Sequence, residues 1–167
     1  MNNSMTEGTK KSAIIRTSSG KKRTEDILGS ILGFLKKSDT ARISWFVSDA
    51  SNVRDQVQGQ IDAIVTEGDL GKPLNGHESL RELEINKRDV ETIWNNVLPA
   101  FSKMQPVGGR LVCVWPTMKS RFGTVTVDPI KTAEASGYTL ISKLVYARPD
   151  QNIRRNIVIL EKKVRQD

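Results

Sequence analysis

The hydrophobic positions of this chain alternate between helical and strand-like spacing. Residues 86–104 (NKRDVETIWNNVLPAFSKM) place apolar side chains at steps of three and four, which predicts an amphipathic helix with a kink at Pro99. Residues 24–37 (TEDILGSILGFLKK) gather five apolar side chains on one face, and Thr24 can cap the first turn. The pattern therefore predicts two helices, well separated in the chain.

The remaining apolar runs are short enough to be strands. They lie at residues 12–19, 42–50, 61–66, 110–116, 139–147 and 156–163. The last two are joined by a short turn-like link, RPDQNIRR, which predicts an antiparallel hairpin. Strands that alternate with helices indicate an α/β fold, so we expect a mostly parallel sheet that closes with a C-terminal antiparallel hairpin.

Polar residues follow several of these strands directly. In sheets of this class, ligands bind outside the carboxyl ends of the strands. Asp49 ends one strand, the next breaks into Thr66 to Leu70, and Pro116 to Lys119 follow RLVCVW. The stretch Asp62 to Leu74 (DAIVTEGDLGKPL) presents two acids around a glycine, which predicts either the floor of an active site or a loop with solvated acids.

Length and composition restrict the class of protein. A chain of 167 residues can bury the core of one domain, and no stretch approaches the ~20 apolar residues of a membrane span. The N-terminus has no apolar leader for secretion, so we expect a cytoplasmic protein. The single cysteine, Cys113, lies in an apolar run without a metal-binding cluster and is predicted to be a small buried side chain, as are Trp45, Trp94 and Trp115.

The net charge of +7 is concentrated at the two ends of the chain. Residues 1–24 carry six Lys/Arg against one acid, and residues 143–167 carry seven against three. We expect residues 1–23 to be a basic, weakly ordered leader and residues 24–167 to be the domain. This distribution suits either contact with a polyanion or solubility alone. Five cations in expected turns could reach phosphates or could form a solvated face: Lys119, Arg121, Arg148, Arg154 and Arg155.

Three stretches together resemble a known family. They are FVSDASNV (46–53), DAIVTEGDLG (62–71) and the tail that starts at GGRLVCVWPTMKSRFG (108–123) and closes with an arginine-rich hairpin. In order and spacing they resemble class I S-adenosylmethionine-dependent methyltransferases. The likeness is strongest to tRNA guanine-N2 methyltransferases with THUMP domains and to related RNA or DNA methylases, and it covers residues 13–163.

The resemblance implies a Rossmann-like methyltransferase sheet and specific site residues. Asp49 and Ala50 would bind the cofactor, S-adenosylmethionine. The turn Thr66, Glu67, Gly68, Asp69 and Leu70 would hold the target base, with the Glu67 carboxylate and the Gly68 carbonyl accepting amine hydrogens. The implied reaction is methyl transfer to an exocyclic amine of a base turned out of its stack, in RNA (tRNA favoured) or in DNA.

Two features depart from this family. The turn lacks the family's prolines and its aromatic residue, and the N-terminal strand with its Gly-rich loop is missing, with Thr17 or Ser18 at the place of an acid that binds ribose. The resemblance thus implies either a truncated reading frame or half of a split enzyme, whose open sheet edge would favour a partner subunit. The alternative is a catalytically degenerate fold that binds RNA or a protein partner.

Overall fold

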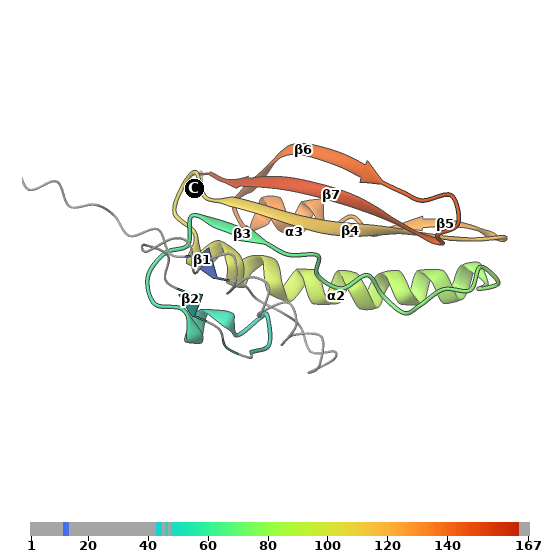
Figure 1. The fold of residues 1–167 in the computed structure, drawn as a ribbon, viewed down its shortest axis with the longest axis horizontal. Helices are drawn as coiled ribbons and strands as arrows, with labels where there is room; N and C mark the ends of the chain where they lie inside the picture. Colours follow the sequence, from blue (N-terminus) through green and yellow to red (C-terminus); the bar gives the residue numbers. More distant parts are fainter. Residues whose placement is uncertain (1–11, 14–42, 45, 47, 164–167) are drawn as a thin grey trace, which may run out of the picture.

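The computed structural model describes residues 12–13, 43–44, 46 and 48–163 (Figure 1). In chain order the elements are β1 (Ser12–Ala13), β2 (Ile43–Ser44), the short 3-10 helix η1 (Val53–Gln56), β3 (Ala63–Val65), α2 (Leu80–Met104), β4 (Arg110–Ser120), β5 (Gly123–Thr126), α3 (Ile130–Ala135), β6 (Tyr138–Tyr146) and β7 (Ile153–Lys162). The helix predicted at residues 24–37, Thr17, Ser18 and Trp45 lie outside the described residues, as does the expected domain boundary at residue 23.

The strands form a mixed sheet. Its order is β3-β4-β7-β6, with β5 paired to the far end of β4, while β1 and β2 form a separate parallel pair. β3 and β4 are parallel, whereas β4 is antiparallel to β7 and β5, and β6 is antiparallel to β7. The α/β class and the C-terminal hairpin are confirmed. The mostly parallel character is not, because the parallel pairs among the described strands are β1–β2 and β3–β4.

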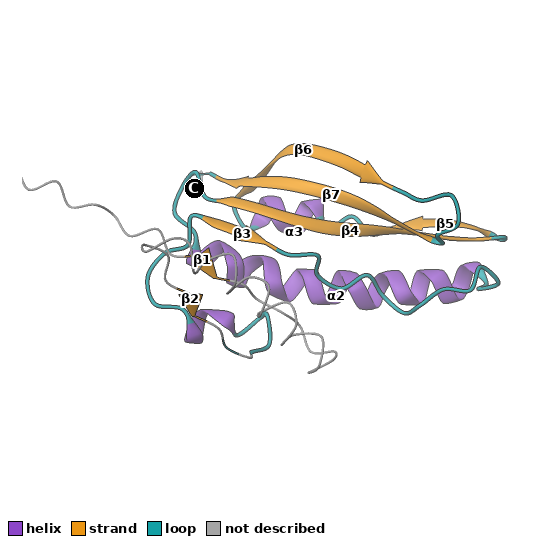
Figure 2. Ribbon diagram, in the orientation of Figure 1, coloured by secondary structure: helices purple, strands orange, loops and turns teal. Residues whose placement is uncertain are grey.

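Helix α2 is the long element that supports the sheet (Figure 2). It begins six residues before the predicted start, because Ser79 and Glu82 form a capping box: each side chain bonds to the backbone N–H of the other. The helix continues through Pro99 to Met104. Figure 1 shows α2 and α3 on the same side of the sheet, so both helices cover one of its faces.

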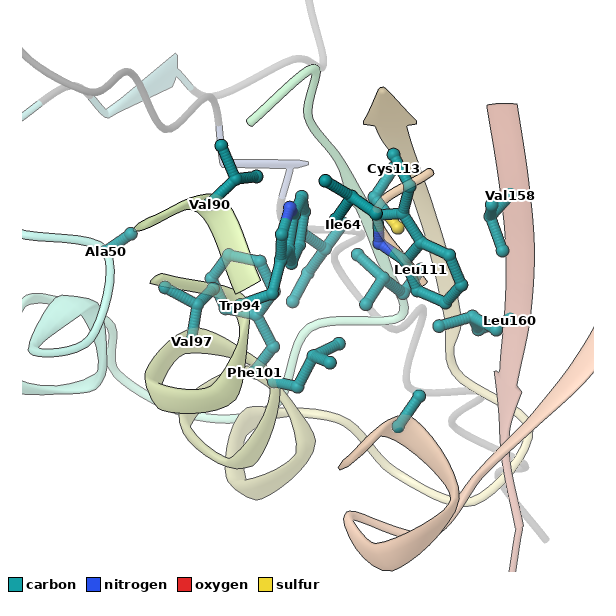
Figure 3. Close-up of a cluster of buried hydrophobic side chains, with 14 of the residues drawn as sticks. Ala50, Ile64, Val90, Trp94, Val97, Phe101, Leu111, Cys113, Val158 and Leu160 are labelled. Carbon is teal, nitrogen blue, oxygen red and sulfur yellow. The ribbon is translucent and has the colours of Figure 1, made fainter. Parts of the chain in front are cut away.

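The core lies between that face and α2 (Figure 3). Trp94 and Phe101 of α2 are almost fully buried, as are Leu111 and Cys113 of β4. The prediction for Cys113 is confirmed, and burial raises the pKa of its thiol to about 12, which makes it a poor nucleophile. Trp94 and Trp115 are each 2% exposed, so their predicted core positions are also confirmed.

Strand β4 does not end where the sequence suggested. We expected the strand to end at Pro116, with the residues up to Lys119 in a loop, and that expectation is wrong because β4 runs to Ser120. Pro116 lacks an N–H, but its carbonyl accepts a bond from the backbone N–H of Val127 at 3.0 Å, and its Cα partner on β7 is Arg155. The strand therefore continues to Ser120 and turns into β5, an element the sequence did not predict.

Among the described residues, no helix combines the length and the hydropathy that crossing a bilayer requires.

Candidate functional site

The turn after β3 is built by its own polar side chains. Thr66 extends the parallel pairing by donating its N–H to the Val112 carbonyl at 2.9 Å. The Thr66 hydroxyl oxygen then accepts the N–H of Gly68 at 3.1 Å, and Asp69 Oδ1 accepts the N–H of Gly71 at 2.6 Å. Such side-chain to backbone bonds form tight turns locally. The TEGDLG sequence therefore forms two consecutive turns through hydrogen bonds between residues that are close in the chain.

Gly68 is required at the centre of this turn. Its φ is +71°, and a Cβ placed there would lie 2.4 Å from Cζ2 of Trp94. The backbone of the turn thus rests directly on the Trp94 indole, which only a residue without a side chain permits.

Asn86 of α2 holds the next part of the loop. Its Oδ1 accepts the N–H of Lys72 at 2.9 Å, and its Nδ2 donates to the Lys72 carbonyl at 3.3 Å. Asn86 is 3% exposed, so its amide satisfies backbone groups that burial would otherwise leave unpaired. These bonds fix the loop along the helix and hold the turn over Trp94.

A small pocket joins the two segments that the sequence marked as functional. Ala50 contributes one wall, and Thr66, Gly68 and Asp69 contribute another. The remaining lining residues come from α2 and are apolar or aromatic: Ile93, Trp94, Val97 and Phe101. Its volume is about 30 Å³, which is room for only a few water molecules. Ala50 and three residues of the turn, Thr66, Gly68 and Asp69, therefore share one cavity.

Trp94, which lines this pocket, carries a buried hydrogen-bond donor without a partner among the described residues. Its indole Nε1 is buried and has no hydrogen-bond partner among the described residues, as is also true of Trp115. Only Trp94 of the two lines the pocket. A buried donor without a partner costs free energy, roughly 1–3 kcal/mol, which makes an acceptor in or near this cavity favourable.

Asp49 itself is turned toward the chain that follows it. Its Oδ1 accepts bonds from the backbone N–H of Ser51 at 2.8 Å and from the Ser51 hydroxyl at 2.5 Å. These bonds, first of all the one from the hydroxyl, hold the pKa of the Asp49 carboxyl below its usual range. Ala50 lines the pocket, whereas Asp49 is exposed and its carboxylate is bonded to Ser51.

Glu67 and Arg155 are joined, although the sequence assigned them to different tasks. Arg155 Nε donates to Glu67 Oε1 at 2.7 Å, and its Nη1 donates to Gln151 Oε1 at 3.3 Å. Neither Glu67 nor Leu70 lines the pocket. Glu67, predicted to accept the amine hydrogens, is therefore paired with Arg155, predicted to contact a phosphate. This ion pair joins the turn to β7.

The five predicted phosphate-binding cations gather at one end of the sheet. This end carries two hairpins, β4–β5 and β6–β7, whose turns lie near one another in Figure 1. Lys119 lies on β4, and Arg154 and Arg155 lie on β7, so the expectation that all five occupy turns is wrong for these three. Arg121 and Arg148 do follow the ends of β4 and β6.

No metal site is present in the part of the chain that the structure describes, because no three His, Cys, Asp or Glu side chains come together there. His77 is exposed.

Comparison with known proteins gives a likeness of fold. The sequence matches no protein-family model and no curated protein. The solved structures that it resembles include NSun6 from Pyrococcus horikoshii, with a TM-score of 0.51 and 16% identity over 83% of this chain and 39% of that one. They also include a Thermus thermophilus protein assigned as a DNA modification methylase (TM-score 0.50, 15% identity, 72% of this chain and 54% of that one). TrmN, also from Thermus thermophilus, is matched over 83% of this chain and 34% of its own length, at a TM-score of 0.47 and 16% identity.

The two neighbours with a TM-score of 0.50 or more, NSun6 and the DNA modification methylase, confirm the resemblance at the level of the fold alone. The chain spans between about a third and about half of the length of these three structures. At such low identity the likeness concerns the backbone and not the reaction.

The sequence did not reveal two residues that shape the site. Trp94 was interpreted only as core, and Asn86 was not singled out. Asn86 and Trp94 lie eight residues apart on α2, and both are covered by the loop after β3. A sequence pattern cannot show which loop covers a helix.

Proposed function

We propose that this chain is the part of an S-adenosylmethionine-dependent nucleic-acid methyltransferase that binds the adenosyl group and presents the base-binding turn. Its substrate would be an exocyclic amine of a base in RNA, with tRNA favoured over DNA. The observation that carries this proposal is the shared pocket: Ala50, from the Asp-Ala segment, and three residues of the turn after β3 line one cavity with Trp94. The three turn residues are Thr66, Gly68 and Asp69.

The lining of the cavity suits the adenine end of the cofactor. Apolar and aromatic walls from Ala50, Ile93 and Trp94 suit the face of an adenine, and the unpartnered Trp94 Nε1–H offers a donor. Asp49 lies one residue before Ala50, and only its Oδ1 is used in the bonds to Ser51. The volume of about 30 Å³ is much smaller than an adenosyl group, so the turn or Ala50 must move to admit it. The bound cofactor would supply the methyl group.

Methyl transfer to an amine relies on positioning and on acceptors for the amine hydrogens. Arg155 holds Glu67 through Oε1, which leaves Oε2 as the carboxylate oxygen outside that bond. The ion pair would fix the carboxylate in one rotamer with Oε2 directed to the amine.

A second function follows from the same geometry. The cavity is small and Glu67 is already neutralised, so the chain could have kept the fold to bind RNA or a partner without catalysis. The five cations at the hairpin end support this alternative. It predicts RNA binding that weakens with salt and no binding of the cofactor.

The partner, the compartment and the domain boundary belong to this proposal as well. A strand with a Gly-rich loop, from a partner subunit or from further polypeptide, would hold the methionine end of the cofactor. We propose residues 24–167 as the methyltransferase-like domain, with residues 1–23 as a basic leader, and we propose the cytoplasm as its location.

Isothermal titration with S-adenosylhomocysteine, the demethylated product, tests the proposal. The chain should bind it, and Ile93→Trp should fill the pocket mouth and weaken binding by at least about tenfold, equivalent to about 1.4 kcal/mol. Ile93 is 38% exposed, so a larger side chain there should not disturb folding.

Ile85→Trp is the matched control. Ile85 lies on the same helix, is 43% exposed and does not line the pocket, so this variant should bind like the wild type. Absence of binding to the wild type, combined with salt-sensitive RNA binding, would replace the methyltransferase proposal with the degenerate module. Equal loss in both variants would show that the pocket is not the site.

A further inference from the structure

Each of the two hairpin turns carries an exposed aromatic ring with an arginine over it. Phe122, in the β4–β5 turn, is 52% exposed, and the guanidinium carbon of Arg121 lies 4.6 Å from its ring centroid. Tyr146, at the end of β6, is 44% exposed, and the guanidinium carbon of Arg148 lies 5.8 Å from its ring centroid. Arg148 Nε also donates to the Tyr146 hydroxyl at 2.8 Å.

Large exposed aromatic rings are not explained by packing. The core rings of this chain, such as Phe101 and Tyr138, are at most 2% exposed. An aromatic ring in water with a guanidinium over it keeps a flat apolar surface ready for a second planar group. Phe122 and Tyr146 thus differ from the core rings in exposure.

The two turns are connected to one another and to the loop after β3. The N–H of Lys119 donates to the Asn152 carbonyl at 2.8 Å, which links the β4–β5 and β6–β7 hairpins. The N–H of Arg121 donates to the Gly76 carbonyl at 2.9 Å. The bond between Glu67 and Arg155 adds a further link between β7 and the turn after β3. The two hairpins that carry the rings are therefore connected to the loop that contains this turn.

We propose that Phe122 and Tyr146, each with its arginine, stack unpaired bases, so that the substrate is a single-stranded segment of nucleic acid rather than a duplex. Stacking is available only to bases that have left the duplex, and aromatic rings accept any base because each has a π-face. Lys119 and Arg154, also at this end, would contact the phosphates between the stacked bases. This inference rests on the proposed function and adds the class of nucleic acid and the residues that select it.

The two rings would also compensate for what the turn lacks. The turn at Glu67 to Leu70 has no aromatic residue, so it cannot hold a base by stacking. Rings on the neighbouring hairpins would hold the bases that flank the target, and the turn would need only to orient the amine.

Fluorescence anisotropy with a labelled unstructured RNA and with the corresponding RNA duplex tests this inference. The wild type should bind the single strand more tightly. Phe122→Ala and Tyr146→Ala should each weaken single-strand binding by about tenfold and leave duplex binding, which depends on phosphate contacts, nearly unchanged.

Two sets of controls make the result specific. Phe122→Tyr and Tyr146→Phe keep the rings and should restore single-strand binding. Val107→Ala removes an exposed apolar side chain just before β4, at the opposite end of that strand, and should change neither affinity.

The outcomes separate this inference from the proposed function. If the ring variants bind the single strand as well as the wild type, or if the duplex binds more tightly, the stacking inference is wrong, whether or not S-adenosylhomocysteine binds. If binding to the single strand depends on the rings but S-adenosylhomocysteine does not bind, the inference stands and the methyltransferase proposal fails.

Discussion

At the scale of single residues, the contact between Gly68 and Trp94 decides the shape of the pocket. The positive φ of Gly68 lets the turn reverse, and the missing side chain lets it rest on the indole. Gly59 has a similar φ of +84°, but a Cβ at Gly59 would meet no atom within 4 Å. Alanine substitutions at the two glycines therefore distinguish the cost of backbone strain alone from the cost of strain combined with a clash.

Gly68→Ala should lower the free energy of unfolding by about 2–4 kcal/mol, since it adds the strain of a left-handed alanine and a clash with Trp94. Gly59→Ala should cost only about 1–2 kcal/mol, from the strain alone. Urea unfolding followed by tryptophan fluorescence measures both values. Equal losses would mean that the indole does not support the turn.

The single ion pair between Glu67 and Arg155 should contribute little to stability. Its side chains are 56% and 29% exposed, and exposed pairs are typically worth ~0.2–1 kcal/mol. Arg155→Gln should therefore lower the free energy of unfolding by less than about 1 kcal/mol, with the difference shrinking as salt is added. A loss several times larger in urea unfolding would assign the pair a structural role and argue against a role in the site.

At the scale of elements, α2 connects the cap at its start to the pocket at its middle. The capping box sets where the helix begins, and the helical repeat then places Asn86 and Trp94 under the loop. The hydrogen bonds from Ser79, first from its hydroxyl and then from its backbone N–H, lower the pKa of the Glu82 carboxyl from the usual 4.5. A depressed pKa in the folded state stabilises the fold above pH 4.5, and this contribution is lost as the pH falls through the lowered value.

Ser79→Ala should destabilise the protein by ~0.5–2 kcal/mol at neutral pH, whereas Ser79→Thr should be close to neutral because threonine keeps the hydroxyl. The pKa of Glu82 should rise toward 4.5 in the alanine variant. Titration of the Glu82 carboxyl carbon by NMR, with urea unfolding at several pH values, checks both expectations. An unchanged Glu82 pKa in Ser79→Ala would contradict the cap.

Much of the element order could be predicted, because helices and buried strands carry their own periodicity. The stripe of α2, the strand RLVCVW and the C-terminal hairpin were all found from it. β5 and α3 were missed because four and six residues are too short for a period to emerge. The continuation of β4 beyond Pro116 was missed because the preference of proline for strand ends is overridden here by pairing with β7.

The candidate site was predictable in part for the same reason. The resemblance of their flanking strands predicted that Ala50 and the turn lie together, and Ala50 does share a cavity with Thr66, Gly68 and Asp69. The pairing of Glu67 with Arg155 could not be foreseen, because it joins residues 88 positions apart whose contact depends on the sheet order.

At the scale of the whole molecule, positive charge lies at the hairpin end of the sheet, whereas the pocket lies between α2 and the turn after β3. In the proposed function the cations on the two hairpins would attract a nucleic acid. The N–H of Arg121, bonded to the Gly76 carbonyl, joins the β4–β5 hairpin to the loop after β3. For single strands, the logarithm of affinity should fall with the logarithm of salt by about 0.7 for each phosphate contact.

Arg154→Ala should therefore reduce the salt slope of single-strand binding by about 0.7. Arg88→Ala, which removes an equally charged and exposed side chain from α2, should leave the slope unchanged. Anisotropy titrations at several salt concentrations give both slopes. A smaller slope in the Arg88 variant would place the nucleic acid on the helix rather than on the hairpins.

The central claim is that the cavity over Trp94 receives the adenosyl group, and the indole N–H signals report on it directly. Adding S-adenosylhomocysteine should shift the Trp94 Nε1–H resonance and the amides of Ala50, Gly68 and Asp69 in a ¹H–¹⁵N spectrum. The buried Trp115 indole, which does not line the cavity, should stay in place. Shifts that spare Trp94, or no shifts at all up to millimolar ligand, would contradict the account.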